Sequence, residues 1–136
     1  MLASVVAATV LGALTLASPA RLNADDPGAG GGTTSMPDQV LRKGCRAYTY
    51  SYRLTPTTDD WQAEMFLLDP DRHRVAAGAL DSDAEPKRGK AEFLLCRGTT
   101  RYGVFKIRGR LTTYDGWEQS STWITPSYVR LHRWGR

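Results

Sequence analysis

Apolar and polar side chains alternate with a period of two along much of this chain, which constrains its fold more than any other feature. Tyr48, Tyr50 and Tyr52 alternate with small or polar residues within residues 46–54, and the same period recurs in residues 104–113. A period of two is that of a β-strand, and no window shows the 3.6-residue period of an amphipathic helix. The pattern therefore predicts an all-β protein.

Turn-forming residues separate the alternating runs at short intervals. We predict strands over residues 46–54, 61–68, 73–80, 91–97, 104–113 and 127–133. Short strands at such spacing are typical of a two-sheet antiparallel sandwich of about seven strands.

The orientation of the tyrosine strip Tyr48, Tyr50 and Tyr52 is open from sequence. If Cys45 is in register with this strand and points inward, the tyrosines point outward and form an aromatic binding strip. If Cys45 lies before a bend, they belong to the core. A face with three aromatic rings and Leu54 favours the core.

The N-terminal residues are typical of a secretory signal peptide. Residues 2–17 are uncharged and apolar but too few to span a bilayer, which takes about 20 residues. Ser18 and Ala20 place small residues at the two positions that a signal peptidase reads. We expect a secreted protein without stable membrane insertion, divided into a signal peptide over residues 1–20, a flexible linker over residues 21–44 and a β-sandwich domain over residues 45–136.

Cys45 and Cys96 are the only cysteines of the chain. In an exported domain such a pair is expected to form a disulfide. The bridge would stabilise a small core by roughly 4 kcal/mol through loop entropy. With only 2 Cys, a four-ligand zinc site built on cysteine pairs is excluded.

The order Cys45, Trp61, Cys96 resembles that of immunoglobulin-like sandwich domains, in which a tryptophan packs against the disulfide joining the two sheets. The segments GVFKIRGRLTTYD (residues 103–115) and PSYVRL (residues 126–131) look like the final strands of small exported sandwich domains of actinobacteria. Those domains are mostly of unknown function. The resemblance implies an immunoglobulin-like fold and an envelope location, and it brings no catalytic residues.

The chain offers little that could carry catalysis. It has no nucleophile elbow, phosphate-binding glycine loop or metalloprotease helix motif. His73 and His132 have no nucleophile assigned beside them, and we predict that both are solvated at the surface. We expect a protein that is not an enzyme and uses no cofactor.

An acidic loop is the one candidate metal site in the pattern. Asp81, Asp83 and Glu85 alternate and could offer several oxygens to a calcium ion. Lys87 and Arg88 follow at once and would disfavour a cation. We expect a solvated loop without metal, with structural calcium as the alternative.

Positive charge is concentrated toward the C-terminus. Residues 45–95 carry seven basic and nine acidic side chains, whereas residues 96–136 carry eight basic and two acidic ones. Arginine forks and flat aromatic rings suit anionic polymers; the alternative is a solubilising sheet face. The candidate binding residues are the cations of two strand faces and the nearby rings: Lys106, Arg108, Arg110, Arg130, His132, Tyr128 and Trp117.

Two classes of function remain. The first is an exported, non-catalytic binding module for an anionic polysaccharide or cell-wall polymer. The second is a protein–protein module, either an accessory subunit or an inhibitor of an exported enzyme, which would use exposed strand edges. Nucleic acid is not expected as a partner outside the cell.

Overall fold

The computed structural model describes residues 30–135, and within them the protein is all-β apart from one turn of 3-10 helix at Arg97–Thr99. The predicted signal peptide and residues 21–29 of the predicted linker lie outside the described residues. The strands are β1 (Gly32–Ser35), β2 (Gln39–Val40), β3 (Cys45–Leu54), β4 (Asp60–Leu68), β5 (Arg74–Asp81), β6 (Arg88–Cys96), β7 (Gly103–Asp115) and β8 (Glu118–His132).

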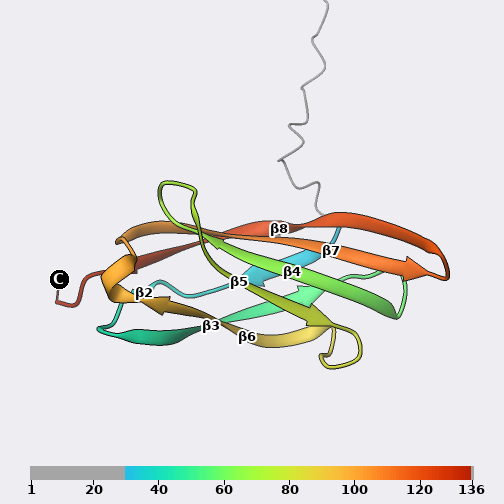
Figure 1. Ribbon diagram of the computed structural model, residues 1–136, viewed down its shortest axis with the longest axis horizontal. Helices are drawn as coiled ribbons and strands as arrows, with labels where there is room; N and C mark the ends of the chain where they lie inside the picture. The colour runs from blue at the N-terminus through green and yellow to red at the C-terminus, as the bar shows by residue number, and fades with distance from the viewer. Residues whose placement is uncertain (1–29, 136) are drawn as a thin grey trace, which may run out of the picture.

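The strands form one hydrogen-bonded path rather than two separate sheets. Its order is β5-β4-β7-β8-β1-β3-β6, and β2 pairs with β8 off this path. All pairs are antiparallel except β1–β8 and β2–β8, which are parallel. The path curls until its end strands β5 and β6 approach each other, so the sheet is nearly closed and barrel-like. Figure 1 shows β4, β7 and β8 lying over β3 and β6. The buried side chains of the two layers form the core between them.

The side chains that alternate in the sequence point alternately into the core and to the outer surface. Tyr48, Tyr50 and Tyr52 are buried, which settles the open orientation in favour of the core. Tyr50 stacks on Phe93 of the adjacent strand with ring centroids 4.5 Å apart. Burial of these large rings contributes to the stability of the fold.

The chain joins the fold earlier than the expected domain start at residue 45. The linker prediction is wrong from residue 30 onward, because β1 and β2 belong to the sheet and Met36 and Leu41 are buried in the core. This segment is bound mainly through its backbone: Gly31 N–H donates to the Trp123 carbonyl at 3.0 Å. A strand that is held through its backbone does not need alternating apolar and polar side chains. The sequence of this segment therefore shows almost no period of two.

The predicted disulfide Cys45–Cys96 is present, with the two Cα atoms 3.9 Å apart. The cysteines face each other across the antiparallel pair β3–β6, where Arg97 N–H donates to the Gly44 carbonyl at 2.9 Å. This marks a non-hydrogen-bonded pair, in which opposite residues come closest.

The position of the bridge differs from the immunoglobulin-like expectation. Cys45 is exposed and lies on the outer face of one layer, opposite in direction to the buried tyrosines. Trp61 is buried beside Ser82 and follows the Leu54 end of β3, at the other end of the strand from Cys45. The disulfide therefore joins two neighbouring strands of one layer, and the tryptophan does not pack against it.

Candidate functional site

Strands β7 and β8 are neighbours, and their outer faces bring most of the candidate binding residues together. Lys106 lies opposite Tyr128, and Arg130 lies opposite Val104. Val104 and Tyr128 are large exposed hydrophobic residues. The expected stripe of cations and rings therefore exists on this face.

Arginines on this face stack on aromatic rings from adjacent strands. The guanidinium carbon of Arg108 lies 4.0 Å from the Trp123 ring centroid, and that of Arg74 lies 4.0 Å from the Phe66 ring centroid. Stacking on a ring leaves the N–H groups at the edge of a guanidinium able to donate hydrogen bonds. Arg74 and Phe66 were not among the predicted site residues. The strand predicted over residues 61–68 nevertheless places Phe66, five residues after Trp61, on the opposite face.

A groove of about 390 Å³ runs over this face, and we call it the basic groove. Its cations are Arg72, Lys106 and Arg108, and Asp69 is its one acidic residue. The full lining comes from β4, the β4–β5 turn, β7 and β8: Leu68, Asp69, Pro70, Arg72, Val104, Lys106, Arg108 and Tyr128.

The β4–β5 turn brings Arg72 into the groove. Arg72 has a φ of 67°, the left-handed region that a non-glycine residue rarely adopts. Asp69 holds this turn, because its Oδ1 accepts the backbone N–H of Asp71 at 2.9 Å and of His73 at 2.8 Å. The one carboxylate of the basic groove therefore accepts hydrogen bonds from the backbone of its own turn.

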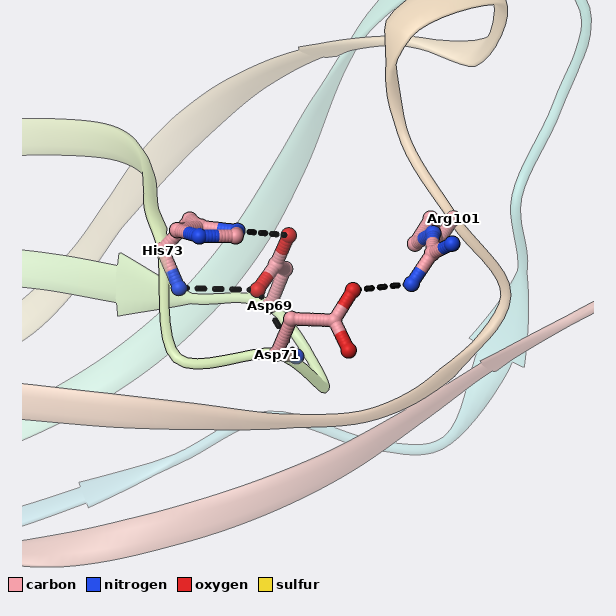
Figure 2. Close-up of polar contacts among 4 residues, drawn as sticks. All are labelled: Asp69, Asp71, His73 and Arg101. Carbon is pink, nitrogen blue, oxygen red and sulfur yellow. Dashed lines mark hydrogen bonds and ion pairs between the residues drawn. The ribbon is translucent and has the colours of Figure 1, made fainter.

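The same turn brings together three groups that could in principle bind a metal ion. Ligand atoms of Asp69, Asp71 and His73 lie within 4.8 Å of one another. Figure 2 shows that each carboxylate already has partners: His73 Nδ1 lies 3.6 Å from Asp69 Oδ2, and Asp71 forms an ion pair with Arg101. These contacts stabilise the turn, and this explains why the three side chains lie close together. His73 itself is exposed, as predicted.

Three other candidates differ from the expected arrangement. Arg110 forms an ion pair with Glu64, in which Nε and Nη2 contact one carboxylate oxygen at 3.1 and 2.5 Å. Trp117 is fully exposed in the two-residue turn of the β7–β8 hairpin, some 30 Å from Lys106 at about 3.3 Å per residue. His132 lies at the opposite end of β8, is half-buried and pairs with Val40 of β2.

The acidic loop after β5 is organised around its own backbone. Asp81 Oδ1 accepts the N–H groups of Asp83 and Ala84 at 3.0 and 3.1 Å. Glu85 Oε2 accepts the N–H of Asp81 at 3.0 Å. These bonds explain why carboxylates recur here, and no ion is needed to explain the turn.

A scan against models of known protein families finds no match, and a search of curated proteins finds no similar sequence. Within residues 30–135 there is no helix with the length and hydrophobicity needed to cross a membrane.

Proposed function

We propose that this protein is an exported, non-catalytic binding module that holds an anionic polymer of the cell envelope or extracellular space in the basic groove. One observation carries the proposal: Arg72, Lys106 and Arg108 line a single open groove together with the exposed ring of Tyr128. The three cations come from two separate parts of the chain, so the fold itself gathers them.

The shape of the groove favours a polymer over a compact ligand. It lies on the open face of a sheet, and the stacked Arg74 continues the basic surface beyond the groove, because it lies opposite the lining residue Leu68. An extended chain with repeated carboxylates or phosphates could contact Arg72, Lys106 and Arg74 at once. Rings beside the cations could stack on sugar faces, which a purely electrostatic surface does not offer.

Binding of the secreted chain to defined polymers tests the proposal. The probes are poly(glycerol phosphate) and polygalacturonate, with neutral dextran as the control. We expect both anionic probes to bind at low salt, to weaken steeply as salt rises, and dextran not to bind. Absence of binding to both anionic probes at low salt would contradict the proposal.

A protein partner is the alternative, and the edges of β5 and β6, which approach each other without pairing in the described residues, favour it. These strands end the hydrogen-bonded path and pair on one side only within the described residues. Such edges accept an added strand from another chain. Cross-linking in culture supernatant separates the two functions, because a stoichiometric protein partner supports this alternative and recovery with wall polymer supports the first.

Export and kinship with small immunoglobulin-like domains of actinobacteria stay predictions. The single disulfide supports export, because such bridges persist in oxidising compartments. The two layers support the kinship, whereas the placement of the bridge within one layer does not.

A further inference from the structure

A cavity of about 720 Å³ opens at the end of the molecule where β2, β6 and β8 finish. Its rim comes from three segments, within residues 40–43, 97–102 and 133–134. Figure 1 shows the end of β2, the short 3-10 helix and the end of β8 gathered at this end, on the left of the view. We call it the end cavity. It shares no lining residue with the basic groove, so the two are separate sites.

The end cavity combines mostly apolar walls with four positive charges. Leu41, Tyr102 and Trp134 supply apolar surface, and Trp134 is 81% exposed. The cations of the lining are Arg42, Lys43, Arg97 and Arg133, and the lining contains no carboxylate. Within residues 30–135 none of these four cations forms an ion pair. An excess of cations beside apolar walls is complementary to a ligand that has both a negative and an apolar part.

Arg97 is already fixed in an orientation suited to an anion. Its guanidinium carbon lies 3.9 Å from the Tyr102 ring centroid, and its Nε donates to the Tyr102 hydroxyl at 2.6 Å. Its Nη1 donates to the Thr100 carbonyl at 3.2 Å. These bonds use two of the five N–H donors of a guanidinium, which leaves donors for a carboxylate or phosphate.

The rim is also held by the fold before any ligand arrives. Tyr48 Oη accepts the backbone N–H of Arg42 at 2.9 Å, and Leu41 N–H donates to the His132 carbonyl at 2.9 Å. The disulfide lies directly before Arg97 and two residues after Lys43, so it ties two rim segments together. A rim held in this way loses less conformational entropy when a ligand binds.

We propose that the end cavity binds an amphiphilic anion, in which a carboxylate or phosphate head is attached to an apolar body. The head pairs with Arg97 and the neighbouring cations, while the body packs on Leu41, Tyr102 and Trp134. The volume falls within the roughly 300–1,000 Å³ of typical small-molecule sites. Four positive charges disfavour a cationic ligand, and a wholly polar anion would leave the apolar walls uncovered. This inference does not depend on polymer binding in the basic groove.

Four ligands with the same ten-carbon chain test the proposal: decanoate, decyl phosphate, decyltrimethylammonium and decyl maltoside. Calorimetric titration below their micelle concentrations should show binding of the two anions. The cationic and neutral ligands should bind at least about tenfold more weakly. The tighter of the two anions then shows whether the natural head is a carboxylate or a phosphate.

Two matched arginine variants place the binding in the end cavity. Arg97→Met should weaken both anions at least about tenfold, whereas Arg88→Met, an exposed arginine on β6 outside the cavity, should change affinity by less than about twofold. If circular dichroism shows that Arg97→Met does not fold, the double variant Arg42→Met, Lys43→Met replaces it with the same expected loss. Equal binding of the neutral ligand would assign the cavity to an apolar partner and overturn the proposal. Anion binding that survives every cavity variant would overturn it as well.

Discussion

Because the tyrosines of β3 are buried, the free energy of unfolding depends on pH in the alkaline range. Burial first, and then neighbouring Tyr52, raise the pKa of Tyr50 to about 12, whereas an unfolded tyrosine titrates near 10. Because the folded state favours the neutral phenol, the contribution of Tyr50 to unfolding free energy is fully present below about pH 10 and is lost as pH rises to about 12. The pKa of Tyr52 is raised in the same direction by burial and then by Glu85.

Replacing the hydroxyl of Tyr50 tests this effect. Tyr50→Phe should reduce the loss of unfolding free energy between about pH 10 and pH 12, measured by urea denaturation at fixed ionic strength. The ring remains, so the stacking on Phe93 is kept. Parallel pH profiles for the variant and the wild type would show that Tyr50 titrates alike in the folded and unfolded chains.

Substitution of Asp69 separates two effects on polymer affinity. Loss of its negative charge should raise the affinity, whereas loss of its hold on the turn that places Arg72 should lower it. Asp69→Ala removes the acceptor that holds Asp71 and His73, so Arg72 should leave its place and affinity for poly(glycerol phosphate) should fall several-fold. Asp69→Asn keeps an acceptor and removes a negative charge, so affinity should rise. If both variants raise the affinity, the groove attracts polymer through net charge alone and Asp69 does not position Arg72.

At the scale of single elements, the disulfide joins β3 to β6 and also anchors the end cavity. Cys45→Ser with Cys96→Ser should lower the free energy of unfolding by roughly 2–4 kcal/mol, measured by urea denaturation. The double variant should also bind decanoate more weakly, because two rim segments lose their covalent tie. Unchanged stability in the double variant would mean that the β3–β6 pairing holds the two strands together without a contribution from the disulfide.

Strand β1 depends on a glycine that no other residue can replace without strain. Gly32 has a φ of 122°, and a Cβ there would lie 2.0 Å from the Arg53 carbonyl oxygen. Gly32→Ala should cost about 2 kcal/mol or more in a thermal or urea unfolding experiment. Gly78→Ala in β5, where a Cβ meets nothing within 4 Å, is the matched control and should change stability little. Equal effects of the two substitutions would show that the β1–β3 pairing does not depend on Gly32.

The sequence predicted those elements whose side chains alternate between core and solvent. Strands β3 and β4 begin within one residue of the expected positions. The first half of β8 was missed, because residues 118–121 are polar and exposed on both faces and show no alternation. Arg72 was missed as a site residue for a different reason: its place in the groove depends on a turn conformation that side-chain pattern does not encode.

For the whole molecule, pairing between distant segments decides the architecture. Closure of the sheet requires β8 to pair with β7 on one side and with β1 on the other, although β1 and β8 are far apart in the sequence. The period of two fixes which face of a strand is buried but not which strands are neighbours. For this reason the sequence indicated an all-β fold with a disulfide, whereas the single curled sheet had to be seen in three dimensions.

The net charge of the molecule alone could attract an anionic polymer. A test must therefore distinguish binding in the basic groove from a general attraction to the positive charge of the chain. Lys106 lies in the basic groove, whereas Lys90 is exposed on β6, opposite Ser51 in the other layer. Lys106→Glu and Lys90→Glu change the net charge of the chain by the same amount. Any difference between them therefore reports where the polymer binds.

The affinity of these two variants for poly(glycerol phosphate), measured side by side at low salt, tests the proposed function most directly. Circular dichroism confirms that both variants are folded. We expect Lys106→Glu to weaken binding at least about tenfold and Lys90→Glu to change it by less than about twofold. Equal losses in the two variants would contradict binding in the basic groove and leave only a diffuse attraction between opposite charges.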